Sequence, residues 1–303
     1  MSDAQILPRV ATLTYCVTDH DAERRAWASL GLTEWHAGTL GPDLCAAWDA
    51  PADAACRTCL MQPPSGEPPF LRFVETERRD GTWPPLSWGW HVTEILAADP
   101  DALAERLEGT AFQVFLGPVD LLPRPKSPRV VQAYGPSGQL IYFTRLLPNG
   151  SRYGISGART FVDRPFKFGM GGPSLDALIH FYGNTMGLKV DEPTFFPGTL
   201  ATRAAGASPD TIAPISVARV ELRRSILELD EFPDTVKPRP RPEGALPGGL
   251  AMIGFEVEDL DALPVPMRAP PRPVATPPYD GRRVAAVVDP AGERLEIIES
   301  RRA

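Results

Sequence analysis

Gly135-Pro136-Ser137-Gly138-Gln139-Leu140-Ile141-Tyr142-Phe143 has a counterpart in the second half of the chain, Asp289-Pro290-Ala291-Gly292-Glu293-Arg294-Leu295-Glu296-Ile297. In each copy, proline at the second position and glycine at the fourth are typical of a tight turn, and an apolar strand follows. The match predicts that the chain is a tandem duplication.

Further landmarks recur in the same order in both halves, as expected for a true internal repeat. They are a polar break with a helical pattern ending in Gly-Leu at 19–32 and 174–188, an apolar strand at 70–74 and 225–229, and an acidic break with a short helix at 99–103 and 259–263. The repeated unit is therefore a strand, a helix and several strands, twice per half.

Composition narrows the class of protein. With 303 residues and 43% hydrophobic content, the chain can bury two cores of about 150 residues each. A net charge of -7 argues against a nucleic-acid partner. No apolar run approaches the roughly 20 residues that span a bilayer, and the N-terminus lacks a basic-then-apolar signal. We expect a cytoplasmic protein without a membrane partner.

The 35 prolines cluster in stretches that interrupt strands, because proline lacks a backbone donor. These stretches are residues 61–69, 118–128, 232–247 and 264–278. Proline, asparagine, glycine and serine also gather between the halves, as in interdomain linkers. We predict a first domain at 1–147, a linker at 148–160 and a second domain at 161–303.

The order of these elements resembles the vicinal oxygen chelate superfamily, which includes glyoxalases, extradiol dioxygenases and bleomycin-resistance proteins. The segments that match best are 175–188, 254–263 and 289–299. The resemblance covers nearly the whole chain and implies an α+β fold, with four βαβββ modules paired into two barrel-like domains. Modules in this superfamily pair within or between chains, so a homodimer and a swapped pairing are both compatible with the sequence.

The resemblance also implies metal ligands on the first and last strands of each module, which this sequence matches only in part. In the second half, Glu228 and Glu296 occupy last-strand positions, but the first-strand positions near Lys167 and Met252 carry no histidine. A divalent metal is compatible with the sequence but not required. Its candidate ligands are Glu228, Glu296 and His91.

In the first half, His91 falls close to a first-strand position, although the alignment there requires a one-residue bulge. It follows Trp88-Gly89-Trp90 on a predicted strand that enters the cleft. We predict a functional role for His91, with a hydrogen-bonded sheet histidine as the alternative. The other three histidines have simpler explanations: His180 on a helix surface, and His20 and His36 in a turn and a loop.

The two glutamates are candidate cleft residues. Alternation along a strand places Glu296 on the face opposite Leu295 and Ile297, so it is buried if that face lines the cleft. An isolated buried carboxylate requires a metal, a cation or a proton. The alternative is that Glu296 faces solvent at a sheet edge. The same choice applies to Glu228, and a carboxylate with a raised pKa could act as a general base.

Arg72, His91 and Tyr142 would form a cationic and hydrogen-bonding set if all three reach a cleft. Such a set can hold an anionic or enolate-like oxygen without a metal. The alternative is that Arg72 pairs with Glu75 or Glu77 and that Tyr142 caps a core.

Together these residues predict an enzyme for a small aromatic or hydrophobic oxygenated molecule. An aromatic ligand would suit the aromatic residues of the first half, which are Phe70, Phe73, Trp83, Trp88, Trp90 and Phe115. The predicted chemistry is proton abstraction with enolate or phenolate stabilisation, a lyase or isomerase reaction. Its catalytic residues would be His91, Glu296, Glu228, Tyr142 and Arg72. The alternatives are an extradiol-type ring-cleaving dioxygenase and a metal-free small-molecule binding or resistance protein.

Overall fold

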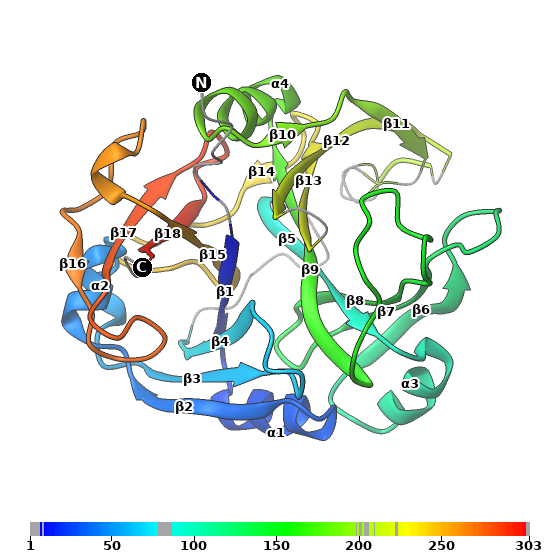
Figure 1. Cartoon of the computed structure of the whole chain (residues 1–303), viewed down its shortest axis with the longest axis horizontal. Helices are drawn as coiled ribbons and strands as arrows, with labels where there is room; N and C mark the ends of the chain where they lie inside the picture. Colours follow the sequence, from blue (N-terminus) through cyan, green and yellow to red (C-terminus); the bar gives the residue numbers. More distant parts are fainter. Residues whose placement is uncertain are drawn as a thin grey trace.

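The computed structural model folds the chain around two curved sheets that lie side by side (Figure 1). It describes residues 7, 9–77, 87–197, 199, 202, 206–208, 210–221 and 224–300. Trp83 lies outside these residues. Among the helices of the described part, none combines the length and apolar character needed to cross a membrane.

The eight-stranded sheet has the order β16-β17-β18-β15-β1-β4-β3-β2. Its strands are β1 (Arg9–Val17), β2 (Thr33–Thr39), β3 (Arg57–Gln62), β4 (Phe70–Glu75), β15 (Gly249–Val257), β16 (Arg272–Pro273), β17 (Arg283–Val288) and β18 (Arg294–Glu299). The N-terminal strands β1–β4 and the C-terminal strands β15–β18 join where β1 pairs antiparallel with β15. In Figure 1 the blue N-terminal strands therefore share a sheet with the orange and red C-terminal strands.

The ten-stranded sheet has the order β10-β12-β13-β9-β5-β8-β7-β6, with β11 paired to β12 and β14 to β5. Its strands are β5 (Ser87–Ala97), β6 (Gln113–Asp120), β7 (Arg129–Tyr134), β8 (Leu140–Arg145), β9 (Val162–Gly172), β10 (Lys189–Val190), β11 (Thr194–Pro197), β12 (Ile212–Glu221), β13 (Ser225–Glu231) and β14 (Lys237–Pro238). In this sheet the strands β5–β8 join the strands β9–β13 through the antiparallel β5–β9 pair.

The sheet pairing crosses between the two halves of the sequence. The first module, residues 9–75, pairs with the fourth, 249–299, while the second, 87–145, pairs with the third, 162–231. The predicted α+β fold of four paired modules is confirmed. Each half, 1–147 and 161–303, contributes one module to each sheet, which is the swapped pairing that the sequence left open.

The helices begin at capping residues, as the polar breaks in the sequence predict. They are α1 (His20–Ser29), α3 (Pro100–Leu107), α4 (Leu175–Ile179) with the π-helix η2 (His180–Thr185), and the single turn η3 (Leu260–Ala262). The side chains of Asp19, Asp99, Ser174 and Asp259 each accept a hydrogen bond from a backbone N–H of the first turn. These caps fix where each helix leaves its preceding strand.

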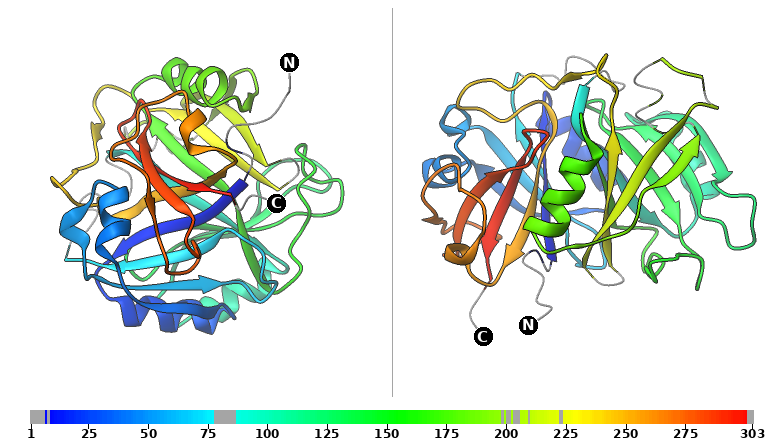
Figure 2. Two further views of the ribbon diagram at one scale, coloured as in Figure 1. Left: turned by 60° about the vertical axis from the view of Figure 1, so that its left-hand side comes forward. Right: turned by 90° about the horizontal axis from the view of Figure 1, so that it is seen from above.

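Alternating side chains on the strands point to opposite faces of each sheet, and the two faces pack into different cores. On β1, Leu13 and Tyr15 belong to a large core with residues of both sheets and of the helices, whereas the side chains between them face the other way. We call the enclosed inner face of the eight-stranded sheet the first cup, and that of the ten-stranded sheet the second cup. Figure 2 shows the two sheets on opposite sides of the molecule.

The two cups are filled to different extents. In the first module, α2 (Pro42–Ala47) and the short helix η1 (Pro51–Asp53) follow β2 and pack over the inner face. They bring Leu44, Cys45 and Trp48 into a buried cluster with Tyr279. The second cup contains a smaller cluster, formed by Leu96, Leu146, Ile155, Phe166, Val217 and Ile226. The first cup is therefore closed and the second is open.

Candidate functional site

The open second cup contains a cavity of about 500 Å³. This is within the range of roughly 300–1,000 Å³ that is usual for small-molecule sites. Apolar side chains form most of its wall, among them Leu116, Leu121, Leu146, Phe166, Phe196 and Ile226. Polar side chains form its floor: Glu94, Gln132, Tyr142, Thr144, Lys167 and Glu228. An apolar wall above a few polar groups is typical of a ligand-binding pocket.

Strand register places the floor residues in one row across the sheet. Gln132 on β7 lies opposite Tyr142 on β8, which is in register with Glu94 on β5. Glu94 in turn lies opposite Lys167 on β9. Glu228 on β13 is in register with Gly169 of β9, two residues from Lys167, and so lies on the same face of the sheet. Neighbours in register point to the same face of a sheet, so all five reach the cavity.

Lys167 is the cation at the centre of this row. Its Nζ lies 2.7 Å from Glu94 Oε1 and 2.8 Å from Glu228 Oε2. Burial disfavours the charged ammonium, but Glu228 and Glu94 outweigh burial and hold the pKa of Lys167 above its ordinary value. Lysine has three N–H donors. The two carboxylates use two of them, which leaves one donor for a ligand oxygen.

The two carboxylates differ in what they can still accept. Glu94 Oε1 bonds to Lys167, and Glu94 Oε2 accepts a hydrogen bond of 3.2 Å from Thr144 Oγ1. Glu228 uses Oε2 for Lys167, and no hydrogen bond joins its Oε1 to another residue of the described chain. Its side chain is 19% exposed, against 6% for Glu94. Glu228 Oε1 is therefore the carboxylate oxygen available to a ligand.

The mouth of the cavity carries exposed apolar side chains. Leu116, Leu121 and Phe196 line the cavity and are 37%, 41% and 39% exposed. They come from β6, the segment after it and β11, on either side of the opening. Apolar side chains that stay exposed around a pocket indicate contact with an apolar ligand.

The first cup contains a buried carboxylate that accepts several hydrogen bonds. Glu296 is fully buried and accepts hydrogen bonds from Thr12 Oγ1 at 2.6 Å and from Trp48 Nε1 at 2.9 Å. The Tyr279 hydroxyl also donates to it. Arg72 adds a salt bridge of 3.4 Å. The sequence alternative of a solvent-facing Glu296 is therefore wrong.

Arg72 is the buried cation of this cluster. Its guanidinium carbon lies 5.1 Å from the centre of the Trp48 ring and 5.3 Å from that of Tyr279. Burial disfavours the charge, but Tyr279 and Glu296 outweigh it, so the pKa of Arg72 is raised. Burial also raises the pKa of Tyr279 well above its ordinary value, which keeps the phenol protonated as a donor. The alternative pairing of Arg72 with Glu75 or Glu77 is not seen, since Arg72 pairs with Glu296 and Glu75 bonds to Arg57.

His91 lies apart from both sets. It is the extra residue of a bulge in β5, because Trp90 pairs with Met170 and Val92 with Gly169. Its Nε2 is 3.2 Å from Asp230 Oδ2, and both groups are buried. A Cβ on Gly169 would come within 2.5 Å of the His91 ring, so glycine is needed there.

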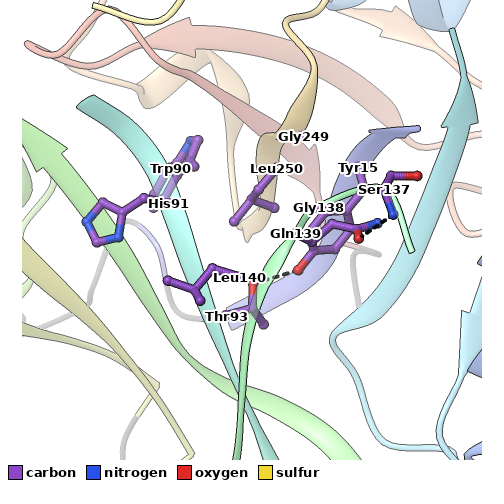
Figure 3. Close-up of a pocket in the computed structure, with 10 residues that line it drawn as sticks. All are labelled: Tyr15, Trp90, His91, Thr93, Ser137, Gly138, Gln139, Leu140, Gly249 and Leu250. Atoms are coloured by element: carbon purple, nitrogen blue, oxygen red, sulfur yellow. Dashed lines mark hydrogen bonds between the residues drawn. The ribbon is translucent and has the colours of Figure 1, made fainter. Parts of the chain in front are cut away.

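A second, much smaller cavity borders His91 between the sheets (Figure 3). Its volume is about 20 Å³, room for about one water molecule. In Figure 3 the imidazole of His91 points away from the other labelled side chains, among them Tyr15 and Thr93, whose hydroxyls are 2.6 Å apart. His91 does not line the large cavity of the second cup.

The predicted site residues therefore separate into three places. Tyr142 and Glu228 line the open cup, Arg72 and Glu296 lie in the closed cup, and His91 lies beside Asp230. Of the other histidines, His180 is exposed on a helix as expected. His20 is instead the buried first residue of α1, and His36 lies on β2 because it pairs with Leu60.

Sequence reasoning missed four residues of the two cups. Glu94 is three residues after His91, and the bulge moves it into the first-strand position. Lys167 occupies a first-strand position, but from the sequence we noted only that this position has no histidine, and not that the lysine itself supplies a cation. Trp48 and Tyr279 come from connections between strands, where no periodicity indicates which side chains point inward.

The residues of the second cup do not fit a bound metal ion. A divalent cation between Glu94 and Glu228 would have to take the place of the Lys167 ammonium, which already binds both carboxylates. Throughout the described part of the chain, no three His, Cys, Asp or Glu side chains are grouped as metal ligands. The donor set of two histidines and one carboxylate that an iron dioxygenase needs is not assembled in either cup.

Comparisons with known proteins agree with this architecture. No family model and no curated protein matches the sequence. Among solved structures, glyoxalase I from Zea mays is similar at 15% identity and a TM-score of 0.63, covering 96% of this chain and 92% of that one. A putative dioxygenase from Bacillus subtilis is similar at 15% identity and a TM-score of 0.63, covering 99% of this chain and 87% of that one.

Both structures belong to the vicinal oxygen chelate superfamily, and the matches extend over nearly the whole chain. The protein therefore has the vicinal oxygen chelate fold, in which four βαβββ modules form two paired domains. At this level of identity the comparison establishes the fold and leaves the reaction and the ligand to the site itself.

Proposed function

We propose that the protein binds a small, largely apolar, oxygenated molecule in the second cup without a metal ion. The observation that carries this proposal is the cavity of about 500 Å³ above the Glu94–Lys167–Glu228 row. The apolar wall supplies affinity by burying the ligand. The third N–H of Lys167 and the unpaired Oε1 of Glu228 supply one donor and one acceptor that orient its polar end.

Neighbouring phenylalanines provide a matched test. Phe196 lines the cavity, whereas Phe195 is 68% exposed and lies outside its lining. A fluorescent apolar probe such as 1-anilinonaphthalene-8-sulfonate should bind the wild type and lose at least about fivefold in affinity in Phe196→Ala. Phe195→Ala should bind it as the wild type does. Equal effects of both variants, or binding unaffected by either, would contradict a ligand site in this cup.

A second candidate is an enzyme that transfers a proton, a lyase or isomerase. It is favoured by Glu228, which lines the cavity together with Tyr142 and binds the Lys167 ammonium through Oε2 alone. In this scheme Glu228 accepts a proton from the substrate carbon, and the Lys167 N–H stabilises the oxygen that gains charge. One oxygen of Glu228 is held by Lys167, and the apolar wall of the cavity is explained without a reaction, so binding is the better-supported function.

Turnover separates the two candidates. In an enzyme, Glu228→Gln should lower kcat by at least about a hundredfold while changing affinity little. Exchange of the acidic C–H proton of a bound ketone for deuterium, followed by NMR in D₂O, measures this step directly. If the wild type exchanges this proton only at the uncatalysed rate, the enzyme candidate is wrong and binding remains the proposed function.

A further inference from the structure

We propose that the ligand of the second cup is an aromatic ring with an O–H or N–H donor, such as a phenol or an indole, and that one molecule binds per chain. This inference rests on the proposed function and names the chemical class of its ligand. It derives from the way the first cup holds two of the protein's own side chains.

The first cup contains a phenol and an indole as internal occupants. The Tyr279 hydroxyl and the Trp48 Nε1–H both donate to Oε1 of Glu296, the latter over 2.9 Å. Both rings lie near the guanidinium of Arg72, at 5.3 and 5.1 Å from its central carbon. The cup therefore binds aromatic donors by a buried carboxylate and a cation near the ring faces.

The second cup repeats the carboxylate and the cation. Glu228 on β13 is in register with Gly169 on the adjacent first strand, as Glu296 on β18 is with Gly254. Lys167 provides the positive charge, 2.8 Å from Glu228 Oε2. The two glutamates thus come from equivalent last strands, whereas the cations come from different strands, Lys167 from the first strand β9 and Arg72 from the last strand β4.

The second cup has a cavity where the first cup has the Trp48 and Tyr279 rings. The space over its inner face is the cavity lined by Phe166, Val217 and Ile226. Its volume of about 500 Å³ accommodates a one-ring or two-ring molecule. Within the described chain, Glu228 Oε1 bonds to no other residue. It is the counterpart of the Glu296 oxygen that receives the Tyr279 and Trp48 donors.

Because the first cup is already occupied by its own side chains, we expect a stoichiometry of one ligand per chain. An aromatic donor that entered the first cup would have to displace Trp48 or Tyr279, both fully buried. The duplication therefore leaves one binding site and one cup that is structural.

Pairs of probes that differ in one donor test the inference. 1-Naphthol should bind the wild-type protein at least about tenfold more tightly than 1-methoxynaphthalene, and indole than 1-methylindole, because methylation removes the hydrogen bond to a charged acceptor. Isothermal titration calorimetry should give one site per chain. This measurement needs no variant, so it does not depend on the folding of an altered protein.

Glu228→Gln then assigns the acceptor. The ratio of 1-naphthol to 1-methoxynaphthalene affinity should fall at least about threefold in this variant, because a neutral amide accepts more weakly than a carboxylate. Tyr279→Phe, which changes the first cup alone, should keep the wild-type ratio.

The outcomes distinguish this inference from the proposed function. If the methyl ethers bind as tightly as the parent compounds, or if two sites per chain are found, the inference is wrong while apolar binding in the second cup stands. If none of the four probes binds and 1-anilinonaphthalene-8-sulfonate does not bind either, both are wrong. If Tyr279→Phe changes the ratio and Glu228→Gln does not, the site lies in the first cup and the inference fails.

Discussion

Lys167 in the second cup and Arg72 in the first are each a protein cation held on the inner face of a sheet by a glutamate from a last strand: Glu228 belongs to the same module as Lys167, whereas Glu296 belongs to the module that pairs with that of Arg72. Lys167 Nζ lies 2.8 Å from Glu228, and the Arg72 guanidinium lies 3.4 Å from Glu296. In both cups a side chain supplies the positive charge that the resemblance would assign to a metal ion. The cups differ in that one remains open above this ion pair.

Replacing one partner of the first-cup pair should strongly destabilise the fold. Arg72→Met leaves Glu296 buried with its charge but without its cation, and we expect a loss of about 3–5 kcal/mol in the free energy of unfolding. Urea unfolding at pH 7 measures this loss. The double variant Arg72→Met/Glu296→Leu should lose less than Arg72→Met alone. A single-variant loss below about 1 kcal/mol would contradict a structural role for the pair.

Removing the Tyr279 hydroxyl is a smaller change to the first cup, and it tests whether the hydrogen bond from Tyr279 to Glu296 stabilises the fold. Tyr279→Phe keeps the ring but deletes one donor to Glu296, so we expect a loss of about 1–3 kcal/mol in the free energy of unfolding. Affinity for ligands of the second cup should stay unchanged. Weaker ligand binding together with an unchanged free energy of unfolding would contradict a purely structural role for Tyr279.

Asp289 should make stability depend on pH. Burial, with the charge of Glu293, raises the pKa of Asp289 to about 7. Its side chain accepts hydrogen bonds from the Tyr182 hydroxyl at 3.0 Å and from the Glu293 backbone N–H at 2.9 Å. Between about pH 4 and pH 7 the folded state holds a proton that the unfolded state releases, so stability falls as pH rises through this window.

Asp289→Asn removes this titration. The free energy of unfolding of the wild type minus that of the variant should fall by on the order of 3 kcal/mol between pH 4 and pH 8. Urea unfolding of both proteins at the two pH values gives this difference. A difference that does not change with pH would show that Asp289 does not titrate in this range.

Removing the ammonium from the second cup should expose a latent cation site. In Lys167→Ala, Glu94 and Glu228 would face each other across the vacated space, which favours a hard divalent cation such as Mn²⁺. Millimolar MnCl₂ should therefore raise the Tm of Lys167→Ala and leave that of the wild type unchanged. Lys189→Ala, at an exposed lysine on β10, is the matched control. Equal shifts in all three proteins would contradict the assigned role of Lys167.

Much of the fold follows from local signals in the sequence. Asp19, Asp99 and Ser174 mark helix starts because their side chains accept the first backbone donors, and the repeated turn before β8 and β18 fixes two last strands. Alternation correctly placed Glu296 opposite Leu295. The pairing of modules across the halves has no such local signal, because four similar modules present equivalent edge strands.

The site was less predictable because it depends on long-range placement. The bulge at His91 shifts the inward position of β5 to Glu94, and a single inserted residue exchanges the two faces of a strand. Trp48 and Tyr279 enter the first cup from connecting segments, whose direction depends on packing against the finished sheet. The sequence thus indicated the floor glutamate, Glu228, but not which cup is open.

Crystals soaked with 4-bromophenol test the central claim most directly, because anomalous scattering locates bromine without reference to the ligand's outline. We predict one bromine site per chain in the second cup, with the phenol oxygen within hydrogen-bond distance of Glu228 Oε1 and the ring above Lys167. Bromine in the first cup, or only on the outer surface, would contradict an open second cup that binds its ligand with the protein's own cation.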